Sequence, residues 1–553
     1  MSDTLINRFR GRLSALIMLA AALWLCVPRV SAADEAADLS PKREMRGAWL
    51  ATVYNIDWPS QKGATPDIVR AQKKELCRIL DTLQYAGVNA VFFQVRPMAD
   101  ALYKSEREPW SAFLTGTRGT RPGWDPLRFA VDEAHARGME LHAWVNPFRF
   151  ALSEPKASTP HDRRAIEKGW LVSHRETTAA PAKKTVPARK SRKSKKRRGR
   201  GGGVAKAGQQ IARQLASKVV TVFDPGNDEA VGHVVDVCRD IIKSYDVDGL
   251  VFDDYFYPEG MPLPKSDNPE READTRRHNV NAAIAAVHGM IQREKPWVRF
   301  GVAPAGVGGG NGKATARYGL DAPPVGKDWM YDKIYCDPLA WLAEGTVDYV
   351  SPQIYWTTDN ATNPYEPIAQ WWDYVARHFG RHCFPSHSLT NRASTPAQWV
   401  EQGRQIDADR ESEVPGTVLY SVSSVNGRKA SGIAGYLHGH QYRLPALTPP
   451  MPWKKTHDPG KITGLKLRRD DGGARLTWAS QPNMRYVVYV VPDDVSALDA
   501  LAPDGNNFAP EYIAGVAYSP EFRLSDTQAR GHWYAVAPFD RCSNEYPVTI
   551  LNR

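Results

Sequence analysis

Short apolar runs alternate with longer segments of helical periodicity between Arg46 and Leu447. Apolar runs bounded by Gly, Pro and Asn predict buried strands, whereas apolar residues spaced three and four apart predict helices. The predicted strands are 46–53, 88–95, 141–145, 249–253, 298–303, 347–353, 383–387 and 416–422. The predicted helices between them are 68–85, 125–138, 229–245, 279–293, 337–344, 368–378 and 396–406.

Eight short strands joined by helices indicate parallel pairing, because each helix returns the chain to the same end of the sheet. The predicted fold over residues 44–447 is therefore α/β, a (β/α)₈ TIM-like barrel. An open doubly wound sheet is the competing topology, but no Gly-rich phosphate loop follows the first strand. Asp125 with Pro126 is a typical helix start, and Gly87 and Gly138 are typical helix ends.

The chain beyond residue 447 has a different pattern. Residues 448–460 are rich in Pro and are predicted to be a linker. Residues 461–553 carry period-two runs at 474–478, 486–490 and 533–537 and no long helix, which predicts a small all-β sandwich. The order of these runs resembles fibronectin type III domains, and Trp478 is expected in the core of the sandwich.

Polar residues fall where the predicted strands end. In a barrel of parallel strands these ends share one rim, which is where active sites of such barrels lie. The expected rim residues are Asp57, Gln94 with Arg96, Asn146, Asp253 with Asp254, and Gln353 with Tyr355 and Trp356.

The segment 248–258 holds the densest candidate chemistry. Its apolar run ends in Asp253 and Asp254, followed by Tyr255, Phe256 and Tyr257. Carboxylates perform acid–base or nucleophilic work on sugars, and aromatic rings stack on sugar faces. The simpler alternative is a strand followed by a solvated acidic turn.

The N-terminal residues 1–32 have the order of a secretory signal peptide: three Arg, an apolar run and a small-residue cleavage site. We expect an exported protein of the periplasm or cell envelope. A lipid anchor is less favoured, since Cys26 follows Leu-Trp-Leu without the small residue that such a signal needs. No later segment is expected to span a membrane. The other five Cys have no C-x-x-C spacing, which indicates neither a zinc site nor a disulfide framework.

The basic charge is local. The run from Lys183 to Arg200 contains 11 Lys and Arg and no acid, which equals the net charge of +11 of the whole chain. It lies inside residues 177–210, which are predicted to be a disordered insert. The run either contacts an anionic polymer by its charge or is a solvated insert without a partner. No motif predicts sequence-specific binding of nucleic acid.

Ordered motifs across residues 44–421 make the chain similar to glycosyl hydrolase-like family 10. They include Tyr-Asn-Ile-Asp-Trp-Pro-Ser at 54–60, Gln-Val-Arg-Pro at 94–97, His-Ala-Trp-Val-Asn-Pro at 142–147, the segment 248–258, and Val-Asp-Tyr-Val-Ser-Pro-Gln-Ile-Tyr-Trp at 347–356. The resemblance implies an exported envelope glycosidase, since the family includes one that cuts peptidoglycan strands lacking stem peptides. The basic insert departs from the family pattern.

Two carboxyl groups are the usual requirement for glycosidic cleavage, one protonated and one ionised. Asp253 is the expected nucleophile or base by analogy with amylase-like barrels, with Asp254 beside it. Glu108 is the expected general acid, because Trp110 close by could desolvate it and raise its pKa. A loop salt bridge is the alternative role for Glu108. The expected substrate-binding residues are Asp57, Arg96, Asp100, Asn146, Tyr255, Gln353, Tyr355 and Trp356.

Two other function classes stay open. A metal-dependent hydrolase of sugar esters or amides would use Asp253 and Asp254 as ligands and would need histidines such as His142, His438 or His440. A non-catalytic glycan-binding protein is the second alternative. For the glycosidase itself, no metal or cofactor is expected.

Overall fold

The structure, a computed structural model, describes residues 40–175, 219–253, 255–326, 328–390, 393–426, 431–470, 473–503, 505 and 507–551. The predicted signal peptide, the basic insert and Asp254 lie outside the described residues. From Pro41 onward the chain forms one unit. Among the described helices, none is long and apolar enough to cross a membrane.

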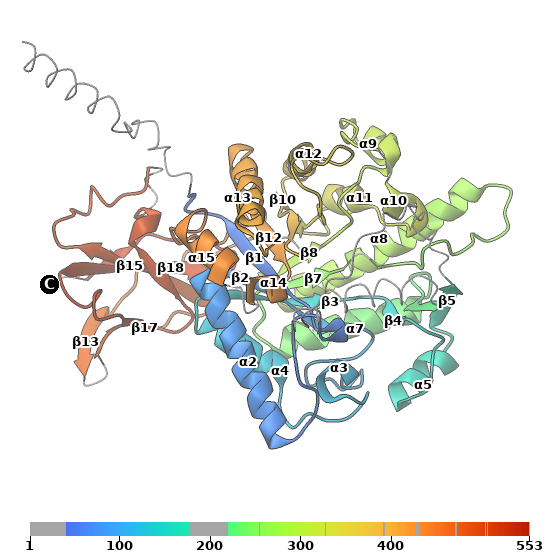
Figure 1. Cartoon of the computed structure of the whole chain (residues 1–553), viewed down its shortest axis with the longest axis horizontal. Helices are drawn as coiled ribbons and strands as arrows, with labels where there is room; N and C mark the ends of the chain where they lie inside the picture. The colour runs from blue at the N-terminus through green and yellow to red at the C-terminus, as the bar shows by residue number, and fades with distance from the viewer. Residues whose placement is uncertain are drawn as a thin grey trace, which may run out of the picture. The chain divides into compact units, whose positions relative to one another are not determined.

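A parallel sheet of nine strand segments dominates the first part of the chain (Figure 1). Its members in chain order are β1 (Met45–Leu50), β2 (Ala90–Arg96), β3 (Glu140–Val145), β7 (Gly249–Phe252), β8 (Arg299–Val302), β9 (Tyr349–Val350), β10 (His382–Cys383), β11 (Ser386–Ser388) and β12 (Gly416–Tyr420). The spatial order is β10-β9-β8-β7-β3-β2-β1-β12-β11. All eight predicted strands are present, with the stretch at 383–387 divided into β10 and β11.

The two edges of this sheet are successive pieces of one stretch of chain. Strand β10 pairs with β9, and β11 pairs with β12. Between the pieces, Phe384 N–H donates to Val350 O at 2.9 Å, and Val418 N–H donates to Pro385 O at 2.9 Å. The sheet therefore curls until its edges share residues 382–388, which agrees with the predicted TIM-like class.

Helices connect consecutive strands. The longer ones are α2 (Pro66–Tyr85), α4 (Pro126–His135), α7 (Asp228–Ser244), α8 (Pro269–Glu294), α12 (Tyr365–His378), α13 (Pro396–Glu411) and α15 (Ser431–Gly439). The shorter ones are α3 (Ala112–Thr115), α5 (Pro160–Glu167), α9 (Lys313–Arg317), α10 (Trp329–Lys333), α11 (Pro338–Ala343) and α14 (Val422–Asn426), with 3-10 turns η1 (Val53–Asn55), η2 (Gly310–Gly312) and η3 (Pro510–Tyr512).

The predicted helix boundaries hold where a cap fixes them. Asp125 accepts a hydrogen bond from Arg128 N–H at the start of α4, and Gly87 and Gly138 take positive φ angles after α2 and α4. Helix α8 starts ten residues before the predicted position 279, because Asn268 caps it with Pro269 in the first turn. The first turns of α8 are rich in polar residues, so apolar periodicity alone does not predict this start.

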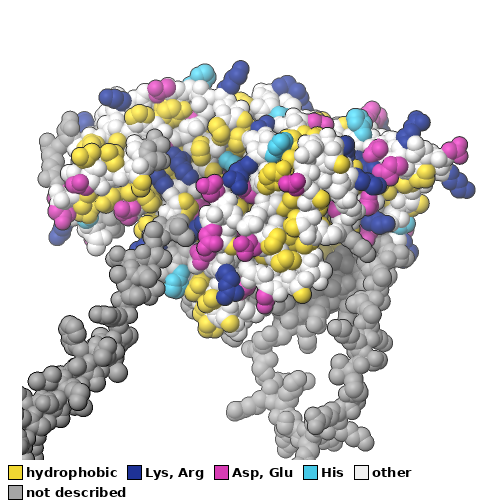
Figure 2. Space-filling view, turned by 90° about the horizontal axis from the view of Figure 1, so that it is seen from above, with side chains coloured by type: hydrophobic (Ala, Val, Ile, Leu, Met, Phe, Trp, Pro, Cys, Tyr) yellow, Lys and Arg dark blue, Asp and Glu magenta, His cyan; other side chains and the backbone are white. Residues whose placement is uncertain are grey.

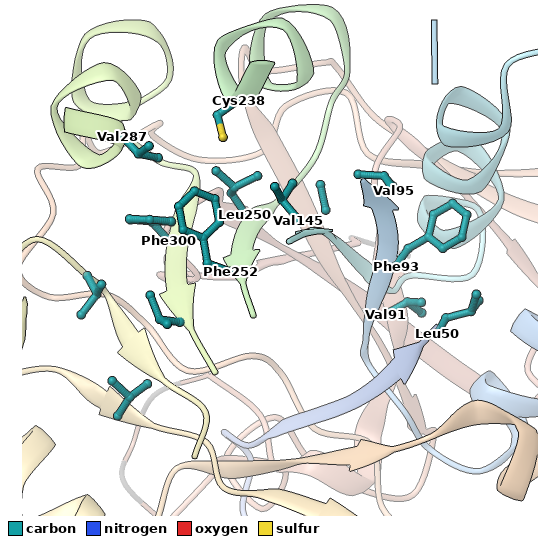
Figure 3. Close-up of a cluster of buried hydrophobic side chains, with 14 of the residues drawn as sticks. Leu50, Val91, Phe93, Val95, Val145, Cys238, Leu250, Phe252, Val287 and Phe300 are labelled. Atoms are coloured by element: carbon teal, nitrogen blue, oxygen red, sulfur yellow. The ribbon is translucent and has the colours of Figure 1, made fainter. Parts of the chain in front are cut away.

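Strand residues alternate between the two buried faces of the sheet. Val91, Phe93 and Val95 of β2 point toward the helices, as do Leu250 and Phe252 of β7 (Figure 3). Phe92, Trp144 and Val251 belong instead to the cluster inside the sheet. Because side chains alternate with period two, the residues at 94, 146 and 253 are directed to the inside as well.

A small antiparallel sheet follows β3 and was not predicted. It comprises β4 (Arg149–Ala151), β5 (Leu171–Arg175) and β6 (Val219–Phe223) in the order β4-β6-β5. Arg175 pairs with Val219 across β5 and β6. The two ends of the segment that holds the basic insert are therefore neighbours in one hairpin.

The C-terminal part contains two antiparallel sheets. One comprises β13 (Lys466–Asp470), β14 (Gly473–Thr477) and β17 (Glu521–Leu524), and the other β15 (Met484–Pro492), β16 (Ile513–Ala517), β18 (His532–Asp540) and β19 (Thr549–Ile550). Leu476, Trp478, Tyr486 and Val536 share a buried cluster, so Trp478 is a core residue as predicted. These sheets support the all-β prediction; the finer fibronectin type III assignment stays a prediction.

Buried ionic contacts join the C-terminal sheets to the N-terminal ends of the parallel strands. Arg485 of β15 pairs with Glu140 of β3 at 2.7 Å, and both side chains are at most 5% exposed. Thr448 also donates to Glu140, at 2.7 Å, and Trp453 Nε1–H donates to Asp348 at 2.7 Å. The first residues of the predicted linker thus contact the parallel sheet directly.

On the face drawn in Figure 2, Lys and Arg side chains are interspersed with Asp and Glu. Cys238, Cys336, Cys383 and Cys542 are buried, as expected for small apolar residues.

Candidate active site

A chain of side-chain amides links the carboxyl ends of four neighbouring strands. The backbone N–H groups of Thr52 and Val53 donate to Gln94 Oε1 at 2.9 and 2.8 Å. Gln94 Nε2 donates to Asn146 Oδ1 at 2.7 Å, and Asn146 Nδ2 donates to Asp253 Oδ2 at 2.8 Å. Gln94 and Asn146 are fully buried. The orientation of Asn146 is therefore fixed by β1 and β2, and it holds one oxygen of Asp253 in place.

Asp253 faces a cavity of about 220 Å³ at this rim. Aromatic rings form much of its wall, namely Trp49, Tyr54, Trp144, Tyr255, Tyr355 and Tyr420. Tyr355 and Tyr420 are stacked at 5.6 Å between ring centres, and Gln353 closes another side. Of the described residues that line the cavity, Asp253 is the only one with a carboxylate. A single carboxylate among flat rings suits a sugar ligand.

A second hollow of about 410 Å³ adjoins the first, since Tyr54 and Leu152 line both. Asp100 lies in this second hollow. It accepts a hydrogen bond from Met98 N–H at 2.9 Å, and Arg118 approaches it at 3.4 Å. Burial raises the pKa of Asp100 despite the nearby positive charge of Arg118. Tyr54 and Leu152 therefore belong to the walls of both hollows.

Asp57 lies behind the cavity wall instead of lining it. Its carboxylate accepts hydrogen bonds from Ala51 N–H at 2.7 Å and from Ser421 Oγ–H and Ser423 N–H at 2.8 Å each. Burial raises the pKa of Asp57 in spite of these donors. Burial also raises the pKa of Tyr420, with further contributions from the charges of Asp57 and Asp253. Tyr420 therefore lies within electrostatic reach of both carboxylates.

Glu108 does not have the environment expected of a general acid. Arg96 forms a two-pronged ion pair with it, at 2.7 and 2.5 Å, and His233 Nε2 lies 3.1 Å away. Burial alone would raise the pKa of Glu108, but the charge of Arg96 and these hydrogen bonds hold it well below its usual value. The expectation of a raised pKa is wrong, because the partner of Glu108 is a guanidinium group and not Trp110. Glu108 also does not line the cavity of Asp253.

The Arg96–Glu108 pair instead supports the strand end that carries Asn146. The guanidinium of Arg96 also donates to Pro147 O at 2.9 Å and to Asn146 O. These contacts fix the backbone that follows β3. Arg96 thus acts on the site through Asn146, without contacting the cavity.

Trp356 also departs from its expected role. Its ring lies against Gly306, where a Cβ atom would approach it to 2.7 Å, and its carbonyl accepts from Gln405 Nε2 at 3.1 Å. It packs at the edge of the core and does not line the cavity, whose aromatic wall is formed by other rings.

Comparison with known proteins agrees with this geometry. A family model described as "Glycosyl hydrolase-like 10" matches residues 44–189 and 203–382, which is more than half of the chain. The chain belongs to glycosyl hydrolase-like family 10. It is similar to glycosyl hydrolase YngK of Bacillus subtilis (strain 168), with 32% identity over 474 residues covering 81% of each chain. Glycosyl hydrolase DigH of Escherichia coli (strain K12) is 30% identical over 462 residues, 76% of this chain and 95% of that protein.

Among solved structures, the glycoside hydrolase domain of PgaB (BpsB) from Bordetella bronchiseptica is similar with a TM-score of 0.43 and 12% identity, over 72% of this chain and 99% of that one. The family match and the two curated relatives identify this family 10 protein as a glycoside hydrolase.

The histidines that a metal-dependent hydrolase would need are not near Asp253 in this family 10 protein. His142 lies inside the sheet, where its ring bonds Glu140 at 3.0 Å. His438 stacks on Tyr85, and His440 packs against Tyr436. Within the described ranges, no group of three or more His, Cys, Asp or Glu is placed to hold a metal ion.

Sequence reasoning missed several residues of the cavity. Trp49 and Trp144 are each the next-to-last residue of their strand, and Tyr420 ends β12. Their inward direction follows from the period-two alternation, which could have identified them. Arg149 carried no signal in the sequence, since it belongs to the short strand β4 that was not predicted.

Proposed function

We propose that this family 10 protein is an exported enzyme that hydrolyses glycosidic bonds in a bacterial cell-envelope glycan. The proposed substrate is peptidoglycan glycan strands that lack stem peptides. Export is supported by the signal-like order of residues 1–32. The observation that carries the proposal is the carboxylate of Asp253, oriented by Asn146 in a cavity with aromatic walls.

In this proposal Asp253 is the ionised carboxylate of the reaction. It acts as the nucleophile if configuration is retained, or as the base for a water molecule if configuration is inverted. The aromatic walls hold sugar faces, and Gln353 and the tyrosines of the cavity bind hydroxyl or N-acetyl groups.

The proton donor is a second carboxyl group, and two residues are candidates. Asp57 has a pKa raised by burial, which favours the protonated form that an acid needs; because it lies behind the cavity wall, it would deliver its proton through a water molecule. Asp254 follows Asp253 directly in the chain. Asp57→Asn and Asp254→Asn, assayed with an activated aryl glycoside and with a natural glycan, distinguish them. Loss of the acid spares the activated substrate, because its leaving group needs no protonation.

The test of the substrate is digestion of purified peptidoglycan, with and without prior removal of stem peptides, with the products identified by mass. Cleavage of the stripped strands alone is expected. Binding without cleavage by the wild-type protein would contradict the proposal and favour a non-catalytic glycan-binding protein.

A further inference from the structure

Arg149 is a buried residue whose guanidinium faces the cavity of Asp253 and has no acidic partner among the described residues. It stands at the start of β4, is 8% exposed, and lines the cavity. Its guanidinium lies 4.1 Å from the centre of the Tyr255 ring. Throughout the described part of the chain, no acceptor lies within hydrogen-bonding distance of this group and no carboxylate within 4.0 Å.

Two other arginines near the site, the buried Arg96 and the partly exposed Arg118, behave differently. Arg96 is paired with Glu108, and Arg118 is paired with Asp162 at 2.8 Å. Both therefore have internal counter-charges. Arg149 differs from both because it lines the cavity of Asp253 and has no ion-pair partner among the described residues.

The N–H groups of Arg149 face the cavity and have no acceptor among the described residues, so a ligand in the cavity can supply one. Stacking on Tyr255 covers one face of the group but leaves the N–H groups at its edge available. A planar guanidinium binds a carboxylate through two parallel hydrogen bonds. The guanidinium can thus bind an anionic group of the ligand.

We propose that Arg149 binds a carboxylate carried by the sugar unit that occupies this cavity. The inference rests on the proposed glycosidase function and specifies its substrate as an acidic saccharide. In peptidoglycan the lactyl carboxylate of muramic acid is free only where the stem peptide has been removed, since the peptide is joined to it as an amide. Recognition by Arg149 therefore supplies a physical reason for a preference for stripped strands.

The test compares two substrates that differ in this one group: stripped glycan strands, and the same strands with their lactyl carboxylates reduced to alcohols. The wild-type full chain is expected to show kcat/KM about 10- to 100-fold lower on the reduced strands, as for loss of a hydrogen bond to a charged group. Arg149→Gln is expected to lower kcat/KM on the native strands by a similar factor, through KM, and to abolish the distinction between the two substrates. Arg149→Lys keeps the charge without the two-pronged geometry and is expected to be intermediate.

Arg70→Gln is the matched control, since it removes the same charge from an exposed position on α2, where the side chain is 71% exposed. It is expected to keep the wild-type preference. Equal wild-type rates on the two substrates would overturn the role of Arg149, even if Arg149→Gln failed to fold, and would leave the proposed glycosidase intact. Cleavage of hyaluronan in place of peptidoglycan strands would overturn the lactyl assignment. Cleavage of no glycan at all would instead overturn the proposed function.

Discussion

At the scale of single residues, the site consists of one cavity carboxylate and a set of side chains that hold it. The sequence predicted Asp253, Asn146, Tyr255, Gln353 and Tyr355 at the rim, because each follows a strand. It could not predict the partner of Glu108. The contact between Arg96 and Glu108 depends on how the loop after β2 folds back, which no local pattern contains.

Replacement of Glu108 tests its structural role. Glu108→Gln leaves Arg96 buried without its counter-charge, so we expect a loss of about 3–5 kcal/mol in unfolding free energy. Thermal and denaturant unfolding measure it. A stable variant that has lost only turnover would contradict this account and restore the role of general acid.

The pH dependence of stability follows from the same ion pair. The pKa of Glu108 is lower in the folded protein than its ordinary value of 4.5, so its ionised form stabilises the fold. This stabilisation is fully present above about pH 5 and is lost as pH falls through and below 4.5. Wild type and Glu108→Gln should therefore differ most in unfolding free energy at neutral pH and converge in acid. A constant difference across this range would contradict the lowered pKa.

Asn146 tests the positioning of Asp253. Asn146→Ala removes the hydrogen bond to Asp253 Oδ2 and frees the carboxylate to rotate. We expect kcat to fall about 100-fold with a small change in KM, as for misplacement of a catalytic group. An unchanged kcat would show that Asp253 is oriented by other contacts.

At the scale of elements, apolar runs were sufficient to predict the eight strands and most of the helices. Burial on both faces makes each strand an apolar run, so the pattern is strong. Strands β4, β5 and β6 were missed, because β4 has only three residues and the insert separates β6 from β5. Only the antiparallel pairing of Arg175 with Val219 shows that the insert joins two neighbouring strand ends.

This pairing predicts that the insert can be removed. Replacing residues 176–218 by a short Asn-Gly turn should leave a hairpin of β5 and β6, since two-residue turns suit antiparallel strands. Turnover of short oligosaccharides and the melting temperature should stay close to wild type. Attachment to anionic envelope polymer, measured by co-sedimentation at low and high salt, should weaken at low salt. Loss of turnover on short substrates would place the insert in the active site.

At the scale of the whole molecule, the C-terminal sheets are joined to the parallel strands through buried charges. Glu140 and Arg485 are 345 residues apart in the sequence. The local sequence around each residue indicates neither its burial nor its partner, so their pairing could not be predicted. Through this pair, the C-terminal sheets supply a counter-charge at the N-terminal ends of the parallel strands, whose carboxyl ends carry the candidate active site.

Arg485→Met tests this coupling. The substitution leaves the Glu140 carboxylate buried without the positive charge of Arg485. We therefore expect a loss of about 3–5 kcal/mol in unfolding free energy. Hydrogen exchange should show the loss in β3 as well as in β15. An effect confined to the C-terminal sheets would contradict coupling between the two parts.

The most direct test is the turnover of Asp253→Asn on stripped peptidoglycan strands, followed by the appearance of new reducing ends. Asn has nearly the same shape as Asp, so the variant should fold and still bind glycan. Wild type should release reducing ends, and Asp253→Asn should do so about 10³-fold more slowly or less. Wild-type turnover by Asp253→Asn would contradict the assignment of this cavity as the active site.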